Sequence, residues 1–489
     1  MSAADFVPFS EAKAPAGADR LSQGALGLVD ISASTMANIG PAYSFFFSFG
    51  LIVLTAGIAA PLTIIAAAVA VALLGNTLSQ FSRVQPSTGG FITFVGKAFG
   101  GTSAVVTALL CGAGYIIAIS SVLAVSGWFL SLMLQYYLSW NVPWIIFSAV
   151  LTAGAVFMML RGVAVSTKLA GFFFGFEMLV LVVVSVVALI KNSGHISAAP
   201  FDPHNITGGF SGAAAGFPLA VYLFIGWENS AALAEETGNP RRNVPRAVFL
   251  SIGLMAVSYL LFAYATVTGF ADNGAKLTAS SDLIPFITVA HNTAAFLAFF
   301  CYLAGMTSTL GVLIAAVNSQ CRLIFNAGRE GLLTRWLGKV HPVRKTPINA
   351  IFAFVGIGSV IILVWGLLHL IGGNSGSMDG LTFFQESGTM GTILILVVYF
   401  MANLALPVYY RKYRPQEFNA VRHLILPILG MIAIAVPVYY LSRPPQPSPY
   451  DWFPYAALAV IVVAVIYAIV ITRRDPGLGD RVGSIVADE

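Results

Sequence analysis

The sequence predicts an all-α integral membrane protein built from twelve membrane-spanning helices. Of its 489 residues, 58% are apolar and only 9% are charged, and the mean hydropathy of +0.85 is too high for an ordinary soluble protein. Polar or Gly/Pro-rich breaks divide the chain into twelve apolar stretches. Each is close to or above the roughly 20 residues that cross about 30 Å of hydrocarbon as a helix. The expected helices cover residues 22–49, 54–80, 103–134, 142–160, 167–190, 210–234, 246–270, 294–325, 347–371, 389–410, 422–442 and 452–472.

Lys and Arg are unevenly distributed between the loops, and this predicts the orientation of the bundle. Basic residues are retained on the cytoplasmic side of short loops. With the amino terminus in the cytoplasm, all 25 Lys and Arg except Lys191, Lys276 and Arg443 fall on that side. We therefore expect a multi-pass protein of the cell (inner) membrane with both termini cytoplasmic. The net charge of +5 reflects this asymmetry, so the lipid bilayer and not a nucleic acid is the expected partner.

Two of the expected helices contain residues that interrupt a helix near the middle of the bilayer. In the first, Gly40 and the helix-breaking Pro41 lie about halfway across, and in the sixth Gly226 precedes Glu228 at a comparable depth. The two breaks are about 187 residues apart, and the third and eighth helices begin about 191 residues apart. Such spacing fits two five-helix repeats, the second inverted relative to the first. The alternative is a simple kink at Gly40 and a packing glycine at position 226.

Three motifs recur in the order expected of one family of membrane proteins. They are residues 86–91 (PSTGGF) followed by Phe99-Gly100, residues 228–247 (ENSAALAEETGNPRRNVPRA), and residues 322–333 (RLIFNAGREGLL) followed by residues 341–342 and 346–350. Together they closely resemble the segment between helices 2 and 3, the sixth-helix signature and the segment after helix 8 of the amino acid-polyamine-organocation (APC) superfamily permeases. The resemblance extends from about residue 22 to 410.

The resemblance implies a leucine-transporter-type fold of 12 transmembrane helices, with a 5+5 inverted repeat and discontinuous helices 1 and 6. The implied parts are a cytoplasmic N-terminal tail (1–20), a first repeat of helices 1–5 (21–191), a second repeat of helices 6–10 (192–412), helices 11 and 12 (413–473), and a cytoplasmic C-terminal tail (474–489). Residues 1–20 are polar and unlike a cleaved signal peptide, so we expect them to stay attached.

A solute pocket is expected where the two breaks expose main-chain groups. N–H groups at the start of a half-helix can hold a substrate carboxylate, and freed carbonyls can hold an ammonium group. The usual Gly-Ser-Gly of the family is replaced by Gly40-Pro41-Ala42, and Pro41 has no N–H to offer. Phe224 and Trp227 are candidates for a ring that closes over the substrate, or they pack toward lipid. The candidate substrate contacts are Asn38, Ile39, Gly40, Ala42, Tyr43, Tyr115, Phe224, Ile225, Gly226 and Trp227.

Four residues are expected to have structural or gating roles. Pro41 shapes the first break. Glu228 either binds a cationic substrate or, as we prefer, bonds the unwound backbone at the second break. Glu235 and Arg242 lie at the cytoplasmic exit, where we expect charges that dock loops or gate the pathway.

Glu177 is the candidate coupling residue. It lies about ten residues into the fifth helix, so it is about 15 Å deep at roughly 1.5 Å per residue, and no Lys or Arg lies within a helical turn. A carboxylate at this depth is costly, so it is expected to take up a proton or to pair with a cation. The resemblance places Glu177 where some proton-coupled relatives carry a lysine that occupies the space of a sodium ion.

A sodium site is the alternative means of coupling. Ala304-Gly305-Met306-Thr307-Ser308 resembles the Ala-x-x-Thr-Ser sodium-ligand pattern of relatives of this fold. In that pattern the Ala304 carbonyl and the Thr307 and Ser308 hydroxyls join the carbonyls of Met36 and Ile39, because hard cations take oxygen ligands. The two hydroxyls could equally bond back to their own helical turn. The coupling ion is therefore a proton or sodium, with a narrow preference for the proton.

The resemblance leaves several transport functions open and gives no indication of an enzyme. The leading interpretation is an amino acid permease that works by alternating access, as a proton-coupled symporter through Glu177. A sodium-coupled amino acid symporter and an amine or polyamine carrier or exchanger are the alternatives, and a nutrient sensor or channel is favoured by no feature. No acid, base or metal constellation, phosphate-binding loop or cofactor motif is present in the sequence, and no obligate protein partner is evident.

Overall fold

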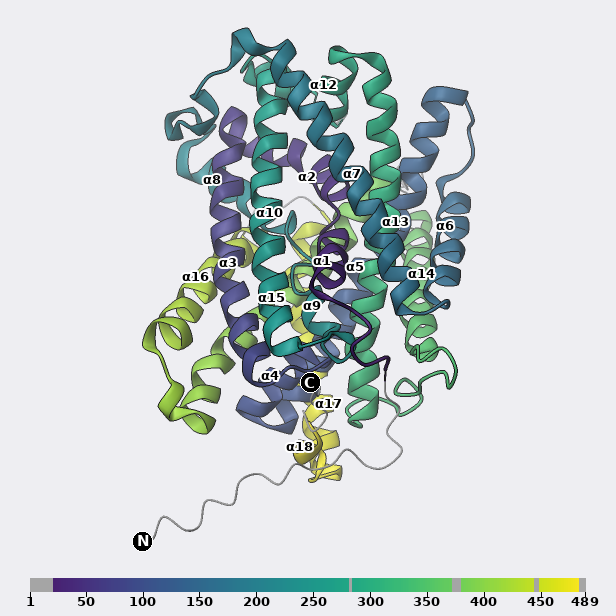
Figure 1. Cartoon of the computed structure of the whole chain (residues 1–489), viewed down its shortest axis with the longest axis vertical. Helices are drawn as coiled ribbons and strands as arrows, with labels where there is room; N and C mark the ends of the chain where they lie inside the picture. Colours follow the sequence, from purple (N-terminus) through teal and green to yellow (C-terminus); the bar gives the residue numbers. More distant parts are fainter. Residues whose placement is uncertain (1–20, 281–283, 372–379, 444–447, 483–489) are drawn as a thin grey trace.

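The computed structural model describes residues 21–280, 284–371, 380–443 and 448–482. Over these ranges the chain is helical and contains no β-strand, apart from one isolated bridge between Leu26 and Thr237. Several of the long helices, such as α3, α10 and α13, run roughly along the long axis of the molecule (Figure 1). They are α1 (Leu28–Ile39), α2 (Pro41–Ala56), α3 (Ala60–Val84), α4 (Gly90–Phe99), α5 (Gly101–Leu138), α6 (Trp144–Met159), α7 (Val163–Lys191), α8 (Gly209–Tyr222), α9 (Asn229–Ala232), α10 (Pro240–Gly269), α11 (Gly274–Ala279), α12 (Pro285–Thr293), α13 (Ala295–Arg329), α14 (Ile348–Ile371), α15 (Gly380–Tyr413), a π-helical turn η8 (Val421–Ile425) that leads into α16 (Leu426–Ser442), α17 (Phe453–Arg474) and α18 (Leu478–Arg481).

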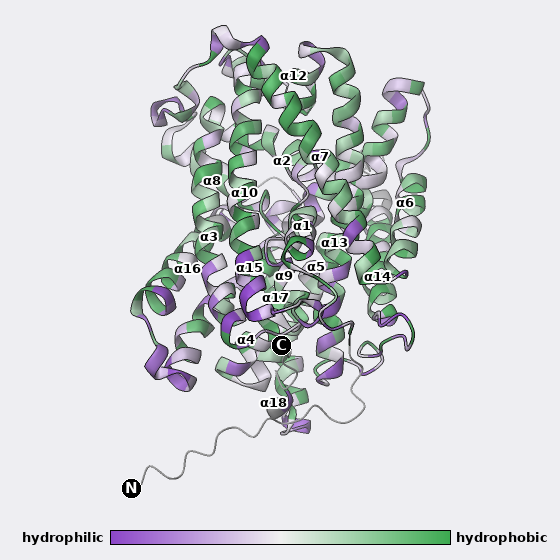
Figure 2. Cartoon of the chain, in the orientation of Figure 1, coloured by the Kyte–Doolittle hydropathy of each residue, from purple (hydrophilic) through white to green (hydrophobic). Residues whose placement is uncertain are grey.

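The helices have the length and surface of a membrane bundle. Within the described ranges, nine helical stretches are long and apolar enough to cross a bilayer, and the first, Leu28–Val84, holds α1, α2 and α3. Large apolar side chains are exposed along the outer helices, for example Val183 on α7 and Val257 on α10. Figure 2 shows hydrophobic residues along the sides of the bundle and hydrophilic ones gathered mainly toward its two ends. The chain is therefore an all-helical, multi-pass membrane protein.

Some helix boundaries differ from those that the sequence predicts. The helix expected at 389–410 begins at Gly380, and α4 and α12 are additional short helices. The early start of α15 includes Glu386, which is buried and accepts a hydrogen bond of 2.7 Å from Trp365 Nε1. From hydropathy alone, a carboxylate at this position is expected outside the membrane. The hydrogen bond from Trp365 compensates for its burial inside the bundle. Each of the twelve expected stretches overlaps a helix, but twelve crossings and the inverted repeat stay predictions.

The first helix breaks at one residue. α1 ends at Ile39, Gly40 adopts φ 62° and ψ 79°, and α2 starts at Pro41. Positive φ favours glycine, and proline suits the first position of a helix because its missing N–H would have no partner in the helix. A Cβ at position 40 would lie 2.1 Å from Val312 Cγ2, so α13 also requires glycine here. Backbone conformation and packing select the same residue.

The second break is longer. α8 ends at Tyr222, α9 begins at Asn229, and the residues between them form turns. Gly226 has φ 107°, and a Cβ there would lie 2.9 Å from the carbonyl carbon of Asn38. The backbones of the two breaks therefore approach each other closely. Because α1 packs against α7, α10 and α13 in the interior (Figure 1), both breaks lie deep inside the bundle.

Gly40→Ala is expected to destabilise the protein by about 1–3 kcal/mol, since it forces a side chain into positive φ and against Val312. The matched control is Gly253→Ala in α10, where a Cβ meets no atom within 4 Å. That substitution is expected to be neutral or slightly stabilising. Thermal unfolding of both purified variants in detergent measures the difference. Equal midpoints for the two variants would contradict the strained break.

Candidate functional site

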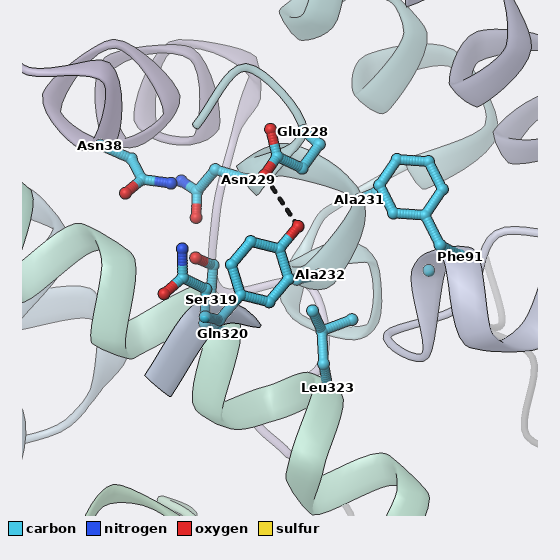
Figure 3. Close-up of a pocket in the computed structure, with 11 residues that line it drawn as sticks. Asn38, Phe91, Glu228, Asn229, Ala231, Ala232, Ser319, Gln320 and Leu323 are labelled. Carbon is cyan, nitrogen blue, oxygen red and sulfur yellow. Dashed lines mark hydrogen bonds between the residues drawn. The ribbon is translucent and has the colours of Figure 1, made fainter. Parts of the chain in front are cut away.

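A cavity lies where the two breaks meet. Asn38 Nδ2 donates to the Gly226 carbonyl at 3.4 Å, and Asn229 Nδ2 donates to Ser34 Oγ at 3.1 Å, so side chains of each broken helix reach across to the other. The space beside these contacts leaves room for about one water molecule. Figure 3 shows its side chains converging from α1, α4, α9 and α13. Its lining residues are Asn38, Gly90, Phe91, Tyr115, Glu228, Asn229, Ala231, Ala232, Ser319, Gln320 and Leu323.

Glu228 lies at the second break with both oxygens engaged. The Tyr115 hydroxyl on α5 donates to Oε1 at 2.9 Å, the dashed line in Figure 3, and the Gly226 N–H donates to Oε2 at 3.2 Å. All three residues are buried, with Glu228 7% exposed. The carboxylate therefore satisfies a backbone donor freed by the break and also faces the cavity. This position is compatible with the backbone-bonding role and with contact to a cationic group.

The start of α2 is capped by a carboxylate of the same chain. Ala42 N–H donates to Glu177 Oε2 at 3.0 Å, and Tyr43 N–H donates to Ser308 Oγ at 2.9 Å. Gly40 N–H bonds back to the Met36 carbonyl at 3.0 Å. The three backbone donors expected to hold a substrate carboxylate are thus engaged within the protein.

Glu177 itself is fully buried on α7. Its Oε2 lies at the positive end of the α2 dipole, which is where an anion is best stabilised. Its Oε1 has no hydrogen-bond partner among the described residues. The side chain therefore presents one hydrogen-bonded oxygen and one unsatisfied oxygen beside the first break.

The expected sodium ligands are only partly brought together. Ser308 lies beside Glu177 and the start of α2. The Thr307 hydroxyl donates to the carbonyls of Leu303 at 3.1 Å and Ala304 at 3.0 Å, in its own helical turn. This is the expected alternative to sodium coordination by that hydroxyl. The Ile39 carbonyl accepts from Ser44 Oγ at 2.6 Å. Within the described ranges no group of three His, Cys, Asp or Glu could hold a metal ion.

Aromatic rings cover the break on the α2 side. The Tyr43 and Tyr222 hydroxyls lie 3.1 Å apart, and the ring of Phe384 lies 5.4 Å from that of Tyr43 and 5.9 Å from that of Tyr222. Neither Tyr222 nor Phe384 is among the site residues that the sequence predicts. Tyr222 is the last residue of α8, one turn before Gly226, and this position was the available signal.

Phe224 and Trp227, the rings that we expected to cover the substrate or pack toward lipid, lie inside the bundle. They are 0% and 1% exposed, so the lipid-facing interpretation is wrong for both. Phe224 packs edge-on against Tyr259, and Trp227 packs against Phe91 and Tyr399. Ile225 lies between them in the irregular segment. Their rings anchor the unwound segment in the core.

Two ion pairs close the opposite side. η5 (Ala234–Glu236) carries Glu236, paired with Arg322 on α13, and both side chains are 0% exposed. Its neighbour Glu235 pairs with Arg329 at 2.7 Å and also accepts from the Leu21 N–H at 2.8 Å. These contacts tie η5 to α13 and to the segment that precedes α1.

Arg242 takes no part in these pairs, and its expected docking or gating role stays a prediction. It is exposed on the first turn of α10, together with Arg241, and the exposed Arg246 follows on the second turn. The arginines that reach Glu235 and Glu236 come from α13 instead, because the last turns of that long helix run past η5.

These features define a multi-pass membrane protein whose central cavity lies between two interrupted helices, with rings on one side and buried ion pairs on the other. The model of the amino acid permease family matches residues 26–470, so the chain belongs to this family, within the APC superfamily. It is a permease and not an enzyme.

Individual relatives are distant. The chain is 21% identical to the uncharacterized amino acid permease YecA of Bacillus subtilis, over 61% of this chain and 67% of that protein. It is 25% identical to the branched-chain amino acid permease BcaP of Bacillus subtilis, over 70% and 73% respectively. It is 27% identical to the Asc-type amino acid transporter 1 of Mus musculus, over 58% of this chain and little more than half, 54%, of that protein.

Proposed function

We propose that the chain is a secondary active transporter that moves an amino acid across the membrane by alternating access. The names of the relatives support an amino acid as the substrate. The paired breaks support a substrate site in the bundle interior, built from main-chain groups and from Asn38, Tyr115 and Glu228. The proposal includes twelve crossings as two inverted five-helix repeats, and cytoplasmic termini in the cell (inner) membrane.

Both sides of the cavity are closed in the arrangement described above. The Tyr43, Tyr222 and Phe384 rings lie on one side, and the Glu235–Arg329 and Glu236–Arg322 pairs lie on the other. Alternating access requires that one set separates while the other stays closed. The rings then act as the outer gate and the ion pairs as the inner gate.

The single observation that carries the coupling mechanism is the Glu177 cap on α2. A substrate carboxylate needs the same Ala42 and Tyr43 N–H groups that Glu177 and Ser308 now occupy. Two carboxylates at one buried helix terminus repel each other, so the second can enter only if the first is neutralised. Proton uptake by Glu177 neutralises its carboxylate and frees the N–H groups at the start of α2 for the substrate. Because the substrate can bind there only when Glu177 is protonated, substrate and proton cross the membrane together. A sodium ion between Glu177 and Ser308 would achieve the same neutralisation.

An amine or polyamine carrier is the second candidate, and Glu228 favours it. The carboxylate and Asn229 Oδ1, which has no hydrogen-bond partner within the described part of the chain, are both acceptors, and both residues line the cavity. A substrate without a carboxylate would not displace Glu177 from the Ala42 N–H at the start of α2. The ammonium group of such a substrate would lie near Glu228. The two candidates therefore differ in whether the α2 cap is displaced.

Uptake into proteoliposomes tests the proposal. Labelled amino acids and polyamines are offered under an inward proton gradient, an inward sodium gradient, or neither. We expect saturable accumulation of an amino acid driven by the proton gradient, with no competition from putrescine. Accumulation under the sodium gradient alone would show that sodium, and not the proton, is the coupling ion. Competition by putrescine but not by neutral amino acids would support the amine carrier. Flux without saturation would contradict a carrier.

A further inference from the structure

A groove lined by four arginines lies at the ends of α3 and α10. Arg83 ends α3, and Arg241, Arg242 and Arg246 occupy the first two turns of α10. We call this the basic groove; its remaining lining residues are Pro245 and Phe249. No carboxylate is among the lining residues that the structure describes. The family's transport function does not account for this cluster.

The charge of the basic groove selects an anion with several oxygens. Guanidinium groups present paired N–H donors that match phosphate oxygens in bidentate geometry. Arg83, Arg242 and Arg246 are exposed, so their donors face outward from the bundle. Three outward guanidinium groups within two neighbouring helix ends would repel one another without a counter-ion. A phosphate group fits this arrangement better than a carboxylate, because it offers more acceptor oxygens.

The apolar face next to the groove indicates where the rest of the ligand lies. Phe249 and Leu250 are 44% and 51% exposed, and Leu254 and Val257 continue the same face of α10 at 42% and 67%. These residues follow Arg246 at helical spacing, so one ligand can touch both the arginines and the apolar stripe. A phosphate attached to long hydrocarbon chains has this amphipathic shape. A free phosphate would use only the arginines.

We propose that the basic groove binds the phosphate headgroup of an anionic glycerophospholipid in the adjoining leaflet, with its acyl chains along Phe249, Leu254 and Val257. Basic pockets between helix ends at a membrane surface are suited to such headgroups. The site is connected to the ion pairs, because α10 follows η5 directly and Asn243 Nδ2 donates to the Gly238 carbonyl at 2.6 Å. A lipid in the groove would therefore brace the segment that holds Glu235 and Glu236.

Lipid binding to the purified full-length protein tests the proposal. Native mass spectrometry in detergent counts bound phosphatidylglycerol and phosphatidylcholine for the natural chain, for Arg242→Gln/Arg246→Gln and for Arg473→Gln/Arg474→Gln. The control pair is exposed at the end of α17 and removes the same charge outside the groove. We expect the groove variant to bind phosphatidylglycerol about tenfold or more weakly, while the control variant keeps the natural affinity. Inorganic phosphate at millimolar concentration should not displace the lipid.

Three results would overturn the proposal. Equal binding of the two lipids by the natural chain would remove the preference for an anionic headgroup. Equal losses in the two double variants would reduce the effect to general attraction between a basic surface and an anionic lipid. Displacement by inorganic phosphate would make the groove a site for the free ion. None of these results depends on transport, so they leave the proposed function untouched.

Discussion

Glu177→Gln is expected to abolish gradient-driven accumulation of the substrate while the protein still folds. The glutamine has nearly the same shape and keeps an oxygen that can accept from the Ala42 N–H, so the fold is expected to survive. Like the protonated acid, it is neutral and does not repel a substrate carboxylate at this helix terminus. It cannot take up a proton, and a neutral amide gives no means to couple proton entry to the helix terminus. The variant should therefore only equilibrate substrate across the membrane. Uptake into proteoliposomes with and without a proton gradient measures this change.

A second carboxylate serves as the matched control. Glu386 is also buried in a long apolar helix, where it accepts a hydrogen bond from Trp365 Nε1. Glu386→Gln is expected to retain accumulation. Glu177→Leu should in addition lose stability by about 1–3 kcal/mol, because the Ala42 N–H is left without an acceptor. Concentrative uptake that is unchanged in Glu177→Gln would remove this residue from the coupling mechanism.

Glu236→Gln is expected to destabilise the protein strongly. Arg322 is fully buried and also donates to the neutral Asn318 carbonyl, so the substitution leaves a buried cation without the carboxylate that it pairs with. Removal of one partner of a buried pair costs about 3–5 kcal/mol. The thermal unfolding midpoint in detergent should fall clearly. Glu236→Leu combined with Arg322→Met should recover most of the loss, because replacement of both ions by apolar side chains is often neutral.

The exposed pair Arg414–Glu417 provides the comparison, since its side chains are 38% and 54% exposed. Glu417→Gln is expected to change stability by less than about 1 kcal/mol. Similar midpoints for Glu236→Gln and Glu417→Gln would show that the Arg322 pair contributes little. In that case the ion pairs would not hold the inner side closed.

The membrane class and the positions of both breaks could be predicted from the sequence. A Gly-Pro step at 40–41 and a glycine followed by polar residues at 226–229 interrupt helices for local reasons, and the structure interrupts α1–α2 and α8–α9 there. The start of α15 could not be predicted, because a carboxylate such as Glu386 is unfavourable inside a membrane helix by its hydropathy alone. Its hydrogen bond from Trp365, a residue of another helix, is visible only in the structure. Tyr222 and Phe384 were missed because neither belongs to a motif.

The amino-acid sequence by itself determined that this chain lies in a membrane as helices and where two of them break, because transfer of apolar residues into lipid and the loss of helical hydrogen bonds depend on neighbours in the chain. Only the tertiary structure decided what fills the breaks. Glu177 reaches Ala42 across 135 positions, and Arg322 reaches Glu236 across 86. Partners this far apart are set by helix packing, which no local pattern encodes.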